Sequence, residues 1–118
     1  MAPKPTKITL KKIAKTLEIF FDDGQRFNLP AELLRVESPS AEVQGHSENQ
    51  KKVIFGRREV KILKVEPVGN YAIRIFFDDL HDTGIFSWKY LYTLGFEKEN
   101  RWNSYLKTLE HKSLSRDP

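Results

Sequence analysis

A chain of 118 residues is the usual size of one domain, and 39% hydrophobic with 31% charged residues is ordinary for a soluble globular protein. No apolar run approaches the ~20 residues of a membrane helix, and the first residues carry no apolar export segment, so we expect a cytoplasmic protein without a membrane partner. The chain has no cysteine, which excludes disulfides, thiolate metal sites and cysteine nucleophiles.

We predict a single α+β domain over residues 1–118, with an ordered core at residues 7–112. Mostly antiparallel strands are expected in one or two small sheets, with short helices after the strand–turn units and a C-terminal helix. Prolines near the start and a polar end of the chain predict flexible tails at residues 1–6 and 113–118.

Alternating apolar residues predict two strands in the first part of the chain, one from Ile8 and one over residues 17–21. The Asp-Asp-Gly segment that ends at Gly24 is a strong hairpin signal, because glycine accepts the positive φ of a tight turn. A short strand over residues 25–28 and a helix of one or two turns over residues 31–35 should follow.

Residues 37–52 have a different composition, rich in serine, glutamate and glutamine, with single proline, glycine, histidine and asparagine residues and few apolar residues. This composition predicts a long loop. A connection of this length inside a small domain is either functional or mobile, and both interpretations remain open.

The next segments predict an antiparallel hairpin, with strands over residues 59–68 and 71–77 joined by a two-residue turn that starts at Gly69. The second of these strands alternates between two faces, so we expect it to be the central strand. A further short strand is expected at residues 85–86.

The end of the chain predicts two consecutive helices. Ser87 is expected to cap a short helix that starts at Trp88 and ends at Gly95, since serine hydroxyls accept free helix amides and glycine ends helices. A second helix over residues 96–112 has its apolar residues at one-face spacing.

One string occurs twice. Residues 17–24 resemble residues 73–80, and each copy leads from a strand through an acidic turn to a short strand and a helix. We use this likeness only to align the elements.

Basic residues gather before the first acidic residue. The cluster consists of Lys4, Lys7, Lys11, Lys12 and Lys15. Lysines that alternate along a strand solvate a sheet face and protect an edge from aggregation, which is the interpretation that we favour. A basic strand also attracts nucleic acid, so nucleic-acid binding is kept as a second alternative function.

The turn after the central strand carries the best candidates for a metal site, Asp79, His81 and Asp82. A carboxylate next to an imidazole can ligate a divalent ion or act as an acid–base pair, and Glu42 or His46 could contribute from the long loop. The alternative is a solvent-exposed turn in which the aspartates accept hydrogen bonds from backbone amides.

Aromatic residues are dense near the end of the chain, where Phe86, Trp88, Tyr90 and Trp102 stand out. Most of them fall at helical spacing rather than across adjacent strands, which favours core packing, with any surplus forming a surface for a protein partner. No motif of a known enzyme class is present.

Two segments carry a family resemblance: residues 78–88, Asp-Asp-Leu-His-Asp-Thr-Gly-Ile-Phe-Ser-Trp, and residues 29–36, Leu-Pro-Ala-Glu-Leu-Leu-Arg-Val. They resemble the small N-terminal domain of γ-butyrobetaine hydroxylase and of its trimethyllysine-hydroxylating relative. The resemblance identifies the chain as a free-standing bacterial copy of this domain, in a family without an established function. Similar domains are fused to P-loop ATPases that carry iron–sulfur clusters.

The resemblance implies a zinc site, because the domain in the hydroxylases holds zinc with three cysteines and the histidine that matches His81. Residues 37–44 offer serines and acids instead of thiolates, so we expect a degenerate zinc site and no cofactor. The catalytic iron and 2-oxoglutarate sites belong to the other domain of the hydroxylases, so we expect no enzyme activity.

The leading hypothesis is a non-enzymatic protein-interaction or adaptor module, whose partner protein acts in iron–sulfur cluster handling or in metabolism. The alternative is weak binding of a metal or small ligand at Asp79, His81 and Asp82.

Overall fold

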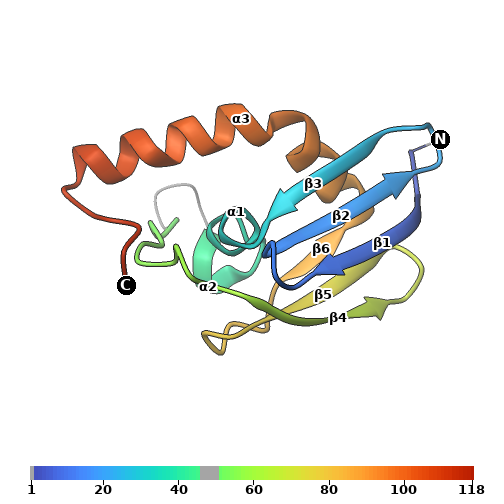
Figure 1. Cartoon of the computed structure of the whole chain (residues 1–118), viewed down its shortest axis with the longest axis horizontal. Helices are drawn as coiled ribbons and strands as arrows, with labels where there is room; N and C mark the ends of the chain where they lie inside the picture. The colour runs from blue at the N-terminus through green and yellow to red at the C-terminus, as the bar shows by residue number, and fades with distance from the viewer. Residues whose placement is uncertain (1, 46–50) are drawn as a thin grey trace.

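The computed structural model describes residues 2–45 and 51–118, which form two three-stranded antiparallel sheets and three helices (Figure 1). The first sheet has the order β1 (Pro5–Lys11), β2 (Thr16–Phe21) and β3 (Arg26–Pro30). The second has the order β4 (Ile62–Val68), β5 (Ala72–Phe77) and β6 (Ile85–Ser87). The helices are α1 (Ala31–Val36), α2 (Ala41–Gln44) and α3 (Trp88–His111). The predicted α+β class is confirmed.

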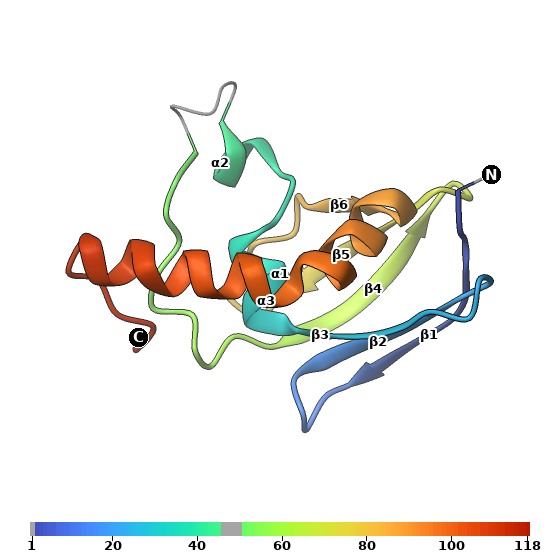
Figure 2. The ribbon, with the colours of Figure 1, turned by 90° about the horizontal axis from the view of Figure 1, so that it is seen from above.

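The two sheets share one hydrophobic core with α1 and α3. The central strands contribute three buried residues each, Leu17, Ile19 and Phe21 from β2 and Ile73, Ile75 and Phe77 from β5. Figure 2 shows α3 starting beside β6 and running away past α1. Since α3 packs on both β3 and β6, it joins one edge of each sheet. None of the helices in the described part of the chain is long and apolar enough to cross a membrane.

The hairpin between β2 and β3 is confirmed. Gly24 has a φ of +89°, which a glycine adopts without strain, and the amide of Phe21 donates to the carbonyl of Gln25 at 2.8 Å. The β4–β5 hairpin differs from its prediction, because Val68 pairs with Ala72 and leaves three loop residues instead of two.

The prediction of two helices after Ser87 is wrong, since α3 is continuous through Gly95. A Cβ atom at this position would come within 2.3 Å of the Phe27 ring, so glycine here permits close packing on β3 rather than ending a helix. The predicted cap is confirmed, because the Ser87 hydroxyl accepts a hydrogen bond from the amide of Tyr90 at 3.1 Å.

The predicted loop at residues 37–52 is partly structured. Ser40 caps the four-residue helix α2 by accepting from the amide of Glu42 at 3.1 Å, and both Ser38 and Val43 are buried. The loop composition hid this helix because a single apolar residue anchors it. His46, named as a possible metal ligand, lies outside the described residues.

Residues of both predicted tails make contacts within the structure. Strand β1 begins at Pro5, inside the expected N-terminal tail. The expected C-terminal tail packs beside residues 56–58, with hydrogen bonds of 2.9 Å from Gly56 and Arg58 amides to the carbonyls of residues 115 and 116. Arg116 also makes two hydrogen bonds, of 2.9 and 2.8 Å, to the carboxylate of Glu32 on α1.

Candidate functional site

The turn that follows β5 directs one side chain into the protein. Its backbone closes where the amide of Phe77 donates to the carbonyl of His81 at 3.0 Å, and Leu80 takes a left-handed φ of +71°. The carboxylate of Asp79 accepts from the amide of His81 at 3.2 Å. The turn therefore holds the His81 backbone from both sides, and the side chain of His81 is 1% exposed.

Both ring nitrogens of His81 contact the segment around α2. The Nε2 atom lies 2.9 Å from the hydroxyl of Ser38, and the Nδ1 atom lies 3.1 Å from a carboxylate oxygen of Glu42. We call these three residues the Ser38–His81–Glu42 contact. It joins two parts of the chain about 40 residues apart.

The chemistry of the partners assigns the tautomer of His81. A carboxylate only accepts hydrogen bonds, so Nδ1 carries the proton toward Glu42 and Nε2 accepts from the Ser38 hydroxyl. Burial lowers the pKa of His81, the charge of Arg35 lowers it further, and Glu42 and Asp79 oppose this with smaller effects. The ring is therefore neutral at physiological pH.

A serine, a histidine and an acid in this order resemble the arrangement that activates a nucleophilic serine. Access to the hydroxyl decides against this role. Ser38 is 0% exposed, and a Cβ atom added at Gly84 would lie 2.5 Å from its Oγ atom, so the chain packs directly against the hydroxyl. The contact fastens the turn to α2 and leaves no room for a substrate at Ser38.

Asp79 is engaged by two arginines. One of its carboxylate oxygens lies 2.7 Å from the Nε atom of Arg35 and 2.7 Å from that of Arg57. Burial acts to raise the pKa of Asp79, but the hydrogen bond and charge of Arg35, with the His81 amide and Arg57, lower it overall. Asp79 is therefore ionised and serves as the counter-charge of a buried arginine.

The contacts that the structure gives Asp82 are with Arg74 rather than with the other two predicted ligands. Its carboxylate lies 3.7 Å from a guanidinium nitrogen of Arg74, and its carbonyl accepts from Arg74 Nε at 2.5 Å. The structure thus brings Asp79 and His81 together and leaves Asp82 apart. Within residues 2–45 and 51–118, no three histidine, aspartate or glutamate side chains are placed to hold a metal ion.

The residues around His81 do not fit the zinc site that the family resemblance implies. Zinc prefers thiolate, imidazole and carboxylate ligands, whereas the group closest to His81 Nε2 is the neutral hydroxyl of Ser38. The Nε2 lone pair already accepts a hydrogen bond, and the other ring nitrogen donates to Glu42. A hydrogen-bonded contact thus occupies both nitrogens.

The four aromatic residues singled out from the sequence mainly join segments of the chain to one another. Phe86 lies fully inside the core, and the indole nitrogen of Trp88 donates to the carbonyl of Asn70 at 2.8 Å. Tyr90 donates to the carbonyl of Glu37 at 2.5 Å. Trp102 is partly buried, and the guanidinium carbon of Arg116 lies 4.9 Å from the centre of its ring.

A second aromatic group was missed from the sequence. Phe21, Phe27, Tyr92 and Phe96 pack mostly edge to face, with ring centroids 5.0 to 5.8 Å apart. We call this group the aromatic end. The available signal was the spacing of Tyr92 and Phe96, four residues apart on one helix face.

The basic N-terminal residues are largely engaged within the protein. Lys11 lies 3.4 Å from the carboxylate of Glu18, and Lys15 lies 2.6 Å from that of Glu59. Lys7 lies over the ring of Phe20 at 5.8 Å. Strand β1 lies at the edge of its sheet, which is the position that the favoured interpretation of this cluster requires.

Comparison with known proteins gives one family match. Residues 8–92 match the family described as gamma-butyrobetaine hydroxylase-like, N-terminal. No curated protein matches the chain.

Solved structures share the fold. One NMR solution structure is 44% identical in sequence, with a TM-score of 0.87, and the alignment covers 100% of this chain and 93% of that one. A second NMR solution structure is 47% identical, with a TM-score of 0.85, and the alignment covers 99% of this chain and 87% of that one. A crystal structure from Acidithiobacillus ferrooxidans is 36% identical with a TM-score of 0.67 and covers 78% and 92%. That protein is described as having unknown function and belonging to the DUF971 family.

Proposed function

This chain belongs to the γ-butyrobetaine hydroxylase-like N-terminal domain family, and from this membership we propose that it is a non-enzymatic module that binds a partner protein through its aromatic end. The observation that carries the proposal is the exposure of Phe96. Its side chain is 58% exposed although it lies on a helix that packs on both sheets. Exposed aromatic rings on a rigid support are typical anchors of protein interfaces.

The aromatic end presents Phe96 in a defined orientation. Its ring lies 5.2 Å from that of Phe27 and 5.0 Å from that of Tyr92. The hydroxyl of Tyr92 donates to Asp23 at 2.5 Å, which ties the helix to the β2–β3 turn. A ring that is held in place before binding loses little conformational freedom in a complex, which favours affinity.

The geometry around Ser38 and His81 supports a role without catalysis. Ser38 is enclosed, and His81 is neutral with both nitrogens engaged. These two residues therefore offer neither an accessible nucleophile nor a free base.

The test compares two phenylalanines of similar exposure. Phe96→Ala removes the exposed ring of the aromatic end, whereas Phe55→Ala removes a ring that is 50% exposed on a loop elsewhere. Tagged wild-type and variant proteins are used to capture partners from native cells, and binding to each purified candidate is then measured by calorimetry. We expect Phe96→Ala to weaken binding at least ~10-fold and Phe55→Ala to leave it unchanged.

Capture of the same partners in equal amounts by both variants would contradict the proposal. The proposal would also fail if the captured proteins bound the wild type no more tightly than they bind an unrelated protein. Captured proteins of iron–sulfur cluster handling would support that class of partner.

A further inference from the structure

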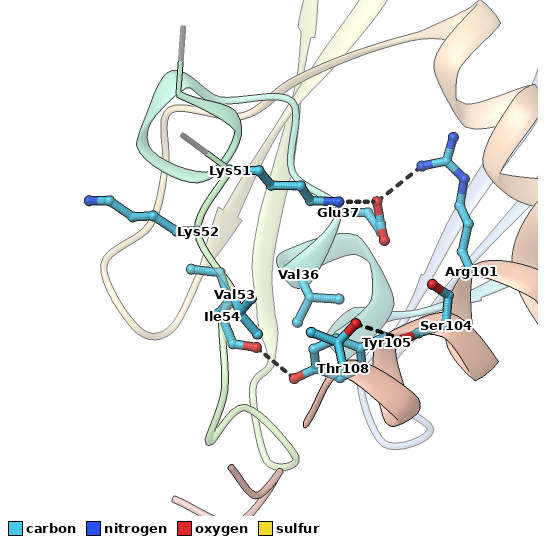
Figure 3. Close-up of a pocket in the computed structure, with 10 residues that line it drawn as sticks. All are labelled: Val36, Glu37, Lys51, Lys52, Val53, Ile54, Arg101, Ser104, Tyr105 and Thr108. Atoms are coloured by element: carbon cyan, nitrogen blue, oxygen red, sulfur yellow. Dashed lines mark hydrogen bonds and ion pairs between the residues drawn. The ribbon is translucent and has the colours of Figure 1, made fainter. Parts of the chain in front are cut away.

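A cavity with a volume of about 290 Å³ lies between the second half of α3 and residues 51–54 (Figure 3). It is separate from the Ser38–His81–Glu42 contact, and its lining includes no residue of the aromatic end. The volume is just below the ~300–1,000 Å³ range of pockets for drug-sized ligands, so the occupant must be a small molecule.

One end of the cavity is charged. The side chain of Glu37 is 9% exposed, and its carboxylate lies 3.0 Å from Arg101 Nη1 and 3.5 Å from Lys51 Nζ. Figure 3 shows Lys51 and Arg101 reaching this carboxylate from opposite sides, while the Lys52 side chain points away. Two cations thus converge on a single oxygen atom at this end.

The opposite side of the cavity is apolar and supported from within. Val36 and Tyr105 belong to a small core cluster against which Val53 and Ile54 pack. The hydroxyl of Tyr105 donates to the carbonyl of Ile54 at 2.7 Å, which holds the wall to α3. Burial raises the pKa of Tyr105 to about 12, so this side stays neutral.

We propose that this cavity binds a small amphipathic carboxylate. The carboxylate group is held by Lys51 and Arg101, and the apolar chain lies along Val53, Ile54 and Tyr105. Concave sites with an apolar lining and a few convergent polar groups are the usual binding sites for small molecules.

The charges of the lining select the sign of the ligand. The lining carries Lys51, Lys52 and Arg101 against one carboxylate, that of Glu37, so an additional anion is attracted and an ammonium group is repelled. Arg101 also pairs through its Nε atom with Glu97 at 2.8 Å, outside the lining, which leaves its other nitrogens toward the cavity. An arginine fork and a lysine ammonium both bind carboxylates well. The hydroxyl of Ser104 lies on the same lining and can donate a further hydrogen bond, whereas the hydroxyl of Thr108 already donates to the Ser104 carbonyl at 3.0 Å.

The experiment compares three probes that share one apolar chain: hexanoate, hexylamine in its ammonium form and hexan-1-ol. Each is titrated into ¹⁵N-labelled protein, and amide shifts are followed by NMR. We expect hexanoate to shift the amides of residues 51–54 and 101–108 in a saturable way, with at least ~10-fold weaker binding of the other two probes.

Two variants locate the site. Arg101→Gln should weaken hexanoate binding about 10-fold, whereas Lys107→Gln, which removes one charge from an exposed position on the same helix, should not. Ser104→Leu places a larger side chain on the lining and should abolish binding, while Asn103→Leu should not. Ser104→Leu tests the site even if Arg101→Gln disturbs the fold.

The proposal is overturned if hexylamine or hexan-1-ol binds as tightly as hexanoate. It is also overturned if Ser104→Leu binds hexanoate like the wild type, or if no amide shifts saturate. None of these results bears on Phe96, so the protein-binding proposal is tested independently.

Discussion

The two turns after the central strands begin with the same residues, since positions 19–23 and 75–79 are both Ile-Phe-Phe-Asp-Asp. Their backbones also agree. The second phenylalanine donates to the carbonyl four residues later, at 2.8 Å in one turn and 3.0 Å in the other. The second aspartate accepts from the amide two residues later at 3.0 and 3.2 Å. The residue between this aspartate and the residue whose amide it accepts from has a positive φ in both turns. It is Gly24 in the first turn and Leu80 in the second.

The side chains of the two turns differ in burial and in the groups that they contact. Asp23 is exposed and accepts a hydrogen bond from Tyr92, whereas Asp79 lies between two arginines. Gln25 is exposed, whereas His81 at the equivalent position is buried. One local geometry therefore closes a simple hairpin in the first sheet and fastens a distant segment in the second. What differs is the surroundings of the turn.

The largest effect is expected for Asp79→Asn. Breaking a buried ion pair costs about 3–5 kcal/mol, and partial exposure of Asp79 reduces the expected loss to about 3 kcal/mol. The side chain of Arg35 is buried, its Nη1 atom has no hydrogen-bond partner among the described residues, and the neutral amide leaves its charge uncompensated. Urea unfolding measures the loss in the free energy of unfolding.

Asp23→Asn is the matched control and should cost much less of the free energy of unfolding, because Asp23 is exposed and its carboxylate accepts from neutral donors, the Tyr92 hydroxyl and the Gln25 amide, rather than from arginines. Similar losses for both variants would show that the turns are energetically equivalent, contrary to the comparison.

A smaller loss is expected for His81→Ala, about 2 kcal/mol at pH 8, because the change leaves a cavity and a buried hydroxyl at Ser38 without its acceptor. Since the pKa of His81 is lowered from 6.5 in the folded state, the unfolded chain binds the proton more readily. The stability from the neutral ring is therefore complete above pH 6.5 and is lost as the pH falls through the folded pKa.

Urea unfolding at pH 8 and pH 5 measures this prediction. The difference between wild type and His81→Ala should shrink at pH 5, and Gln25→Ala should show little loss at either pH. A difference that stays constant with pH would rule out a neutral, buried His81.

The smallest effects are expected for substitutions at Leu80 and Gly24, the residues with a positive φ in the two turns. Leu80→Gly should stabilise the protein by a few tenths of a kcal/mol, because relief of a left-handed leucine is partly offset by the entropy of glycine in the unfolded chain. Gly24→Ala should destabilise by about 1 kcal/mol, since its Cβ meets no atom and only the backbone conformation opposes it. Thermal unfolding measures both, and a stabilising Gly24→Ala would contradict the shared turn geometry.

The predictions that succeeded depend on residues close together in the chain. The alternation of β2 and β5, the turn at Gly24 and the cap at Ser87 each involve neighbours within a few positions. Such signals can be recognised without knowledge of the fold because the atoms that make the contact belong to one short segment.

The features that were missed depend on distant residues. A glycine such as Gly95 is typical of a helix end, but here it is needed because the ring of Phe27 on β3 leaves no space for a Cβ atom. Phe96 lies on a helix with other aromatics, and only the position of β3 shows that its ring extends a cluster to the surface.

The sequence by itself determined that the Asp-Asp turn forms twice, because backbone amides and aspartate side chains within the turn stabilise it locally. It also placed a histidine at the second turn. Only the tertiary structure decided what this histidine does, since Ser38 and Glu42 reach it from 43 and 39 positions away. Burial among those partners makes His81 a neutral structural contact, whereas the same turn in the first sheet stays in solvent.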